Sequence, residues 1–293
     1  MGCNLCGANN SVLLFVVNGF DVVRCRKCGL IYVNPIPDGS SIFKLYVEYR
    51  KVPDNRYQLY RVQGESVKEK ILRDTHDLGI THFGELLDIG CGLGYFLQAI
   101  RPLCKTVYGT EISHFQVLFA RERLGKNVLE SPLNALKLHD ETFDTITMLD
   151  VIEHLPNPRS ELQETHRRMK KGGLIVIMTP NINSLTFKIT RERYFPLYPP
   201  EHLFYFTPET LKKLLVLTGF VVVKVMTEGI DLFNIWQKFT VRNTKRNRIA
   251  EERDRFYRPY KHLKPLTCLK KVVDIIIGKL GLGDSLYVYA FKI

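Results

Sequence analysis

The sequence predicts an α/β fold with a largely parallel sheet, preceded by a small cysteine-rich module. Three observations favour this fold class: an apolar run followed by alternate glycines at 86–94, an apolar run ending in an acid at 105–112, and two C-x2-C pairs before residue 30. Buried parallel strands are continuous apolar runs, and strands that alternate with helices form parallel sheets. With 293 residues, 45% of them hydrophobic, the chain is long enough for one large domain with small additions.

The cysteine pairs come first in the chain. Cys3 and Cys6 form one pair, and Cys25 and Cys28 form the second after 18 intervening residues. This spacing places four thiolates at the corners of a tetrahedron and predicts zinc, which is structural because four sulfur ligands leave no open position. Disulfides are the alternative, and a reducing context with scattered remaining cysteines disfavours them. An Asn-Gly dipeptide between apolar runs predicts a hairpin, so we expect residues 1–37 to form a zinc-ribbon module.

The next segment, residues 38–83, is expected to form a helical cap or linker. Its aromatic side chains either belong to a core or line a substrate cleft. These aromatic residues are Phe43, Tyr46, Tyr49, Tyr57 and Tyr60.

The glycine-rich stretch carries the first chemical signal. Three alternate glycines follow Asp88 and permit backbone angles that bring a ligand close to the main chain. The stretch is not the dinucleotide fingerprint, because Tyr95 stands where that motif needs its last glycine. Glu111 ends the next strand, 21 residues beyond Gly90, and a carboxylate there can accept hydrogen bonds from both hydroxyls of a ribose.

Later strands are expected near 128–129 and at 143–149, 174–178, 220–226 and 285–292. Asp150, Glu153 and His154 follow one of these strands, at the carboxyl edge where ligands bind in open α/β sheets. His202 precedes a helix that begins at Thr207, with threonine as the cap and proline at the first position.

The order of these motifs resembles class I S-adenosylmethionine (SAM) methyltransferases over roughly residues 84–230. The resemblance implies a Rossmann-like seven-stranded sheet, completed by an antiparallel last strand at 284–293. The cysteine pairs followed by such a core are similar to methyltransferases of types 23 and 12 from sugar, polysaccharide and secondary-metabolite pathways. The resemblance implies that the following residues bind SAM: Asp88, Gly90, Cys91, Gly92, Gly94, Glu111, Ile112, Leu133 (through its backbone amide) and Asp150.

The resemblance also implies methyl transfer to a hydroxylated small-molecule or sugar-like acceptor. His154 and His202 are the candidate bases, with Glu153 beside them, because histidine accepts a proton near neutral pH. Alternatively Asp150 joins these three residues in holding a divalent metal, which resembles the small-RNA 2'-O-methyltransferases and, more loosely, ubiquinone-pathway O-methyltransferases. In a third interpretation Glu153 and His154 only cap a helix. An RNA-modifying enzyme and a non-catalytic SAM-binding module are the alternative functions.

The net charge of +12 is concentrated near the C-terminus. Residues 242–271 hold eleven basic and three acidic residues and supply +8 of it, within a basic helical insertion expected at 231–283. This segment is either a solvated helical surface or a phosphate-binding patch for nucleic acid, nucleotide-sugar or membrane. The apolar residues of 269–280 either pack on the domain or lie on a membrane surface. No apolar run is long enough to cross a bilayer and no signal-peptide core is present, so a cytoplasmic enzyme is expected; the oligomeric state is left open.

Overall fold

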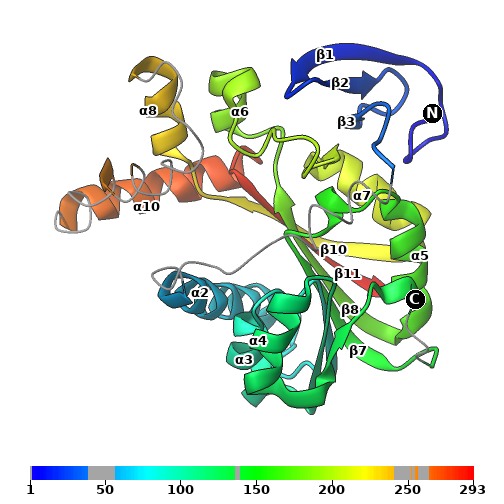
Figure 1. Ribbon diagram of the computed structural model, residues 1–293. Coiled ribbons are helices and arrows are strands. Elements are labelled where there is room, and N and C mark those ends of the chain that lie inside the picture. Colours follow the sequence, from blue (N-terminus) through cyan, green and yellow to red (C-terminus); the bar gives the residue numbers. More distant parts are fainter. Residues whose placement is uncertain (1, 39–56, 136–138, 241–251, 253–254, 257–263) are drawn as a thin grey trace.

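A seven-stranded sheet forms the centre of the molecule (Figure 1). The computed structural model describes residues 2–38, 57–135, 139–240, 252, 255–256 and 264–293. The strand order is β10-β11-β8-β7-β4-β5-β6. Only β11 runs antiparallel to both of its neighbours, which confirms the predicted antiparallel last strand. The strands are β4 (Glu85–Ile89), β5 (Thr106–Glu111), β6 (Val128–Glu130), β7 (Phe143–Leu149), β8 (Met169–Pro180), β10 (Phe220–Glu228) and β11 (Ser285–Lys292).

Helices cover both faces of this sheet (Figure 1). On one face lie α2 (Tyr57–His76), α3 (Tyr95–Ile100) and α4 (His114–Leu124), and on the other α5 (Pro158–Arg168) and α7 (Pro208–Leu217). Two separate clusters of buried apolar side chains fill the layers between helices and sheet. Shorter helices are α6 (Leu185–Thr190) and the 3-10 turns η2 (Arg101–Leu103), η3 (Gly125–Asn127), η4 (Leu133–Ala135), η5 (Ile152–His154) and η6 (Arg191–Arg193).

The cysteine-rich segment forms a second, small sheet near the carboxyl ends of the parallel strands of the central one (Figure 1). Its order is β1-β2-β3-β9, with β1 (Ser11–Val17), β2 (Phe20–Cys25), β3 (Ile31–Val33) and β9 (Phe204–Tyr205). The predicted hairpin turn is present, with Asn18 and Gly19 both at positive φ. The fourth strand, β9, comes from within the predicted methyltransferase core, so the predicted module does not close its sheet alone.

One local prediction needs correction. The strand expected at 174–178 begins earlier, at Met169, because the chain bulges while keeping its partner: the pairing with β7 shifts from Phe143–Met169 to Thr145–Leu174. Gly172, with φ at +74°, supplies the left-handed backbone angle that the bulge requires.

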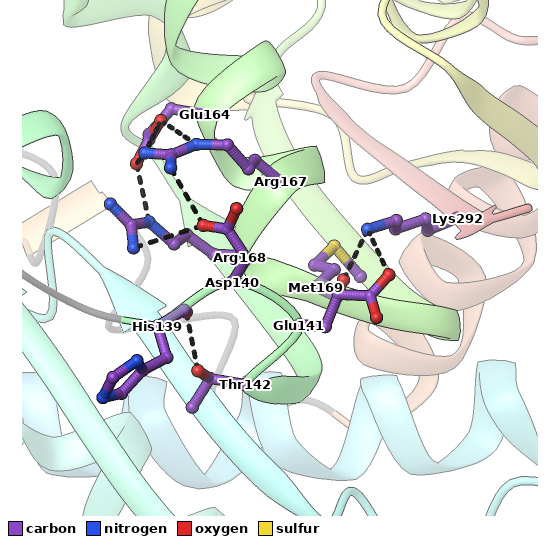
Figure 2. Close-up of polar contacts among 9 residues, drawn as sticks. All are labelled: His139, Asp140, Glu141, Thr142, Glu164, Arg167, Arg168, Met169 and Lys292. Carbon is purple, nitrogen blue, oxygen red and sulfur yellow. Dashed lines mark hydrogen bonds and ion pairs between the residues drawn. The ribbon is translucent and has the colours of Figure 1, made fainter.

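A network of ion pairs and hydrogen bonds lies at the edge of the sheet opposite the glycine-rich stretch (Figure 2). The carboxylate of Glu164 accepts hydrogen bonds from Arg167 and from the buried Arg168, and Arg167 also reaches Asp140 at 2.9 Å. Lys292 of β11 donates to the carbonyl of Met169 at 2.7 Å. These contacts tie α5 to the loop that enters β7 and the last strand to the start of β8, and they stabilise the scaffold away from the candidate site.

The C-terminal insertion contains α8 (Leu232–Thr240) and α10 (Lys264–Lys279). The apolar residues of α10 are divided, because Ile277 is buried whereas Val272, Ile275 and Ile276 are more than half exposed. Among the residues the structure describes, no helix is long and apolar enough to cross a bilayer. Phe43, Tyr46, Tyr49 and most of the basic stretch 242–263 lie outside the described residues.

Candidate functional site

The glycine-rich stretch turns sharply after β4 and leads into α3. Gly90 has φ of +70°, and a Cβ there would lie 2.6 Å from Cγ2 of Val151, so the segment after β7 packs directly on its backbone. Gly94 caps α3 in the left-handed conformation, where a Cβ would lie 2.8 Å from Leu124. The predicted requirement for glycine therefore has a steric cause at both positions.

A cavity of about 350 Å³ opens beside this turn, within the size range of small-molecule sites. Five of the residues predicted to bind the cofactor line it: Asp88, Gly90, Cys91, Gly92 and Asp150. The remaining lining residues are Tyr60, Gln63, Gly64, Val67, Leu93, Tyr95, Phe96, Gln116, Leu149 and Met178. The predicted SAM residues that the structure does not place in this lining are Gly94, Glu111, Ile112 and Leu133.

Helix α2 provides one wall of the cavity. Of its lining residues, only Tyr60 was a candidate from the sequence. A Cβ on Gly64 would lie 2.8 Å from the backbone carbon of Tyr95, so α2 and α3 touch main chain to main chain there. Glycine inside a helix is unfavourable unless packing needs it, and Gly64 within α2 was therefore the available signal. Gln63 carried no such signal.

Two carboxyl groups line the cavity: the buried Asp88 of β4, and Asp150, which directly follows β7 and is exposed to solvent. Burial raises the pKa of Asp88 to about 7, partly offset by the Thr147 hydroxyl, which donates to Asp88 Oδ1 at 2.6 Å. Desolvation by the surrounding protein and the nearby Glu153 raise the pKa of Asp150 to about 7. Asp150 also holds φ at +55°, which is uncommon for a residue with a side chain and typical of functional sites. A cationic ligand in this cavity would favour the ionised form of both carboxyl groups.

Glu111 braces the glycine-rich stretch from the end of β5. Its Oε2 accepts from the Gly92 amide at 3.0 Å, and its Oε1 accepts from the Ile112 and Ser113 amides at 2.7 and 2.9 Å. A carboxylate has about four acceptor positions, so about one remains for a further donor. Glu111 was expected to accept hydrogen bonds from both ribose hydroxyls. Beside its three bonds to the loop, it has about one acceptor position left for a ribose.

Glu153, His154 and His202 form a tight polar group at the carboxyl edge of β7 and β8. One ligand atom from each lies within 4.8 Å of the others, and Asp150 is outside this group. Thr179 donates to Glu153 Oε2 at 2.9 Å, whereas the buried Glu153 Oε1 has no hydrogen-bond partner among the described residues. Burial raises the pKa of Glu153 to about 7 and lowers that of His154.

The tautomer of His154 follows from its surroundings. Its Nδ1 lies 2.7 Å from the carbonyl oxygen of Glu201, which can only accept, so Nδ1 carries the proton. Nε2 then presents a lone pair 3.9 Å from Glu153 Oε1, and the His202 ring packs edge-on with its centroid 4.6 Å away. This arrangement suits either a proton shared in the group or a cation held by it.

The four N-terminal cysteines converge as predicted. Cys3 and Cys28 place their sulfur atoms 3.5 Å apart, as do Cys6 and Cys25, and all four lie within 4.8 Å of one another. Sulfur atoms bound at 2.3 Å to one tetrahedral zinc lie about 3.8 Å apart, so the cluster fits this metal. Burial tends to raise the pKa of Cys25, but the backbone amides of Cys28 and Lys27 outweigh it and lower that pKa to about 7.

The core of the chain is similar to known proteins. A family model described as a methyltransferase domain matches residues 63–225, more than half of the chain. The ubiquinone biosynthesis O-methyltransferase of Glaesserella parasuis is 34% identical over 110 residues, which cover 34% of this chain and 47% of that protein. The enzyme of the same name from Dinoroseobacter shibae is 30% identical over 145 residues, 46% of this chain and 58% of the relative. The chain thus matches about half the length of these curated relatives.

Solved structures show the same fold. A SAM-dependent methyltransferase of Archaeoglobus fulgidus is 26% identical with a TM-score of 0.53, covering 80% of this chain and 99% of that chain. A SAM-dependent methyltransferase of Thermotoga maritima is 19% identical with a TM-score of 0.55, covering 86% of this chain and all of that one.

Proposed function

The chain belongs to the methyltransferase-domain family of SAM-dependent enzymes, and from this premise we propose that it transfers the methyl group of SAM to an oxygen atom of a small hydroxylated acceptor. The observation that supports this most directly is the cavity beside the glycine turn, lined by Asp88 and Asp150. Two acidic side chains suit the positively charged sulfonium of SAM. The O-methyltransferase names of the relatives support oxygen as the acceptor atom.

The residues present fit SAM as cofactor. The glycine turn offers main chain to the ligand because side chains are excluded there. Glu111 would accept one hydrogen bond from the ribose through its remaining acceptor position. SAM supplies an electrophilic methyl group, and the protein has to align the acceptor with it.

For the acceptor side we propose that Glu153, His154 and His202 handle the proton of the hydroxyl group. His154 Nε2 is the base, since Nδ1 is committed to the Glu201 carbonyl. A divalent cation held by the same three side chains is the second candidate, supported by the buried Glu153 Oε1 without a partner among the described residues. Cobalt absorption spectroscopy distinguishes the two, because only a metal site gives a Co²⁺ spectrum that His202→Ala abolishes.

We also propose that Cys3, Cys6, Cys25 and Cys28 bind a structural zinc ion and that the enzyme works in a reducing compartment such as the cytoplasm. The sulfur separations support the metal. Four zinc-bound thiolates leave no position for substrate, so the metal takes no part in methyl transfer. Metal analysis of purified protein, with one zinc per chain expected and none in Cys25→Ser, tests this assignment.

The first experiment is calorimetric titration with S-adenosylhomocysteine, the product, which binds without turnover. Glu111→Ala should weaken binding by about ten- to a hundredfold, because a charged hydrogen-bond acceptor is lost. Glu130→Ala is the matched control, since Glu130 ends the adjacent β6 and pairs with His114. No binding by folded, zinc-loaded protein would overturn the proposal. Methyl transfer from radiolabelled SAM to catechols, sugars or RNA then separates the small-molecule acceptor from the RNA alternative.

A further inference from the structure

The cysteine-rich segment shares a sheet with the strand that follows His202. Strand β3 pairs antiparallel with β9, with Ile31 opposite Tyr205 and Tyr32 opposite Phe204. The Val33 amide also donates to the Leu203 carbonyl at 2.9 Å. The edge of the small sheet is therefore completed by a strand of the methyltransferase core.

The same short segment is bonded on its other side to the catalytic group. The Leu203 amide donates to the carbonyl of Glu153 at 2.8 Å. Leu203 thus links β3 on one side to the turn that carries Glu153 and His154 on the other. Because His202 precedes Leu203 and His154 follows Glu153, this one connection determines the positions of both histidines.

A second attachment comes from the first cysteine knuckle. Asn4 lies between Cys3 and Cys6, and its Nδ2 donates to Asn157 Oδ1 at 2.8 Å. Its Oδ1 accepts from the Arg159 amide at 3.2 Å. Asn157 caps α5 and stands three residues after His154, so Asn4 fixes the far end of the histidine-bearing turn.

Apolar packing makes these attachments rigid. One buried cluster joins residues of both parts: Leu5, Leu30 and Tyr32 from the cysteine-rich segment, and Ile152, Leu203 and Phe204 from the core. The rings of Tyr32 and Phe204 stack with centroids 6.2 Å apart. The described lining of the cofactor cavity, in contrast, contains no residue of the segment 2–38.

We propose that the segment 2–38, with zinc bound by its four cysteines, positions His154 and His202 for the acceptor without supporting the SAM cavity, and that Asn4 is a positioning residue. The inference rests on the proposed function, in which these histidines act on the acceptor. Zinc loading would then set the acceptor side of the site alone.

The test uses zinc-loaded, full-length protein with ¹⁵N-labelled histidine. Asn4→Ala removes both side-chain hydrogen bonds, and Asn10→Ala, at an exposed position of the same segment, is the matched control. We expect Asn4→Ala to shift the ring resonances of His154 and His202, assigned with single His→Gln variants. The resonances of the exposed His76 and His114 serve as internal references and should stay in place.

Two further readouts complete the test. Hydrogen exchange at the Leu203 amide should become about tenfold faster in Asn4→Ala, because its local structure opens more readily. Binding of S-adenosylhomocysteine should be unchanged. Asn4→Asp keeps the acceptor for the Arg159 amide and should give smaller shifts in the same direction, and removal of zinc by a chelator should reproduce the Asn4→Ala pattern.

The outcomes separate the two proposals. Unmoved His154 and His202 resonances in both Asn4 variants, with product binding intact, would overturn the positioning role and leave the proposed function in place. Weaker product binding in Asn4→Ala would also overturn it, because the segment would then support the whole fold. Absence of product binding in the wild type would instead remove the proposed function.

Discussion

The affinity of this protein for SAM should rise with pH, whereas its affinity for S-adenosylhomocysteine should change much less. Desolvation raises the pKa of both cavity carboxyl groups, Asp88 and Asp150, to about 7, and the nearby Glu153 contributes at Asp150. The two ligands differ in charge at sulfur, because the sulfonium of SAM is a cation and the thioether of the product is neutral. A cation favours the ionised carboxylate, so SAM binding should release protons near neutral pH.

The magnitude follows from the pKa. A carboxyl group with a pKa of about 7 is ionised in about one molecule in eleven at pH 6 and in about ten of eleven at pH 8. Binding that requires the ionised form therefore gains about tenfold over this interval for one group and about a hundredfold for two. The dissociation constant of the product divided by that of SAM should therefore rise by about tenfold to about a hundredfold between pH 6 and pH 8.

Calorimetry in two buffers of different ionisation enthalpy measures the released protons directly. At pH 7 each such carboxyl group is about half protonated, so SAM should release about half a proton per group and the product almost none. Asp88→Asn should remove its share. Thr147→Val removes a hydrogen bond that lowers the pKa of Asp88, so the rise should move to higher pH. A ratio of affinities that stays constant from pH 6 to pH 8 would refute this reasoning.

The same shifts affect the ligand-free fold. In the unfolded chain an aspartate loses its proton near pH 4, whereas folded Asp88 keeps it to about pH 7. The stabilisation from this group is thus fully present below about pH 4 and is lost as the pH rises through 7, at about 1.4 kcal/mol per pKa unit. SAM should restore stability at pH 8 more than the product does.

Two further predictions concern α2. Lys70→Met should destabilise the protein by about 3–5 kcal/mol in urea unfolding, because it leaves the buried Asp74, 3.0 Å from the lysine, without that cation; Lys68→Met, which breaks a more exposed pair on the same helix, should change stability by less than about 1 kcal/mol. Gly64→Ala should destabilise by about 1–3 kcal/mol and weaken product binding, since the new methyl group meets the α3 backbone. Ser66→Ala, at an exposed position of α2, should leave both unchanged or slightly improve stability, and an equal effect of the two alanine substitutions would contradict the packing explanation.

Local patterns were sufficient to predict the sheet and five of the fifteen residues that line the cavity. The strands of the central sheet are apolar runs that end in a charged or turn residue, and such runs form buried strands wherever they lie in the chain. The glycine turn was predictable for a similar reason, because the positive φ of Gly90 and Gly94 is a requirement of the local backbone. The cysteine cluster was predictable because the two pairs specify their own geometry.

Contacts between distant segments were not predictable. Gly64 meets the backbone of Tyr95 only because α2 folds back over α3. One of the three amides on Glu111 comes from Gly92, in the turn after β4, and this bonding limits what the carboxylate can offer a ribose. Neither contact leaves a repeating pattern in the sequence, since each depends on one pair of elements meeting at one point.

The union of the small sheet with the core illustrates why a ligand pattern predicts a site better than a domain boundary. The cysteine spacing indicated a self-contained module, yet fewer than 40 residues bury too little surface to be stable without a metal or a partner. Strand β3 also has an outer edge whose amide and carbonyl groups need partners. The two residues of β9 meet that need, and only Leu203 separates them from His202. The strand that covers the edge of the small sheet therefore lies next to a candidate catalytic residue, so the stability of the small sheet and the geometry of that residue depend on the same hydrogen bonds.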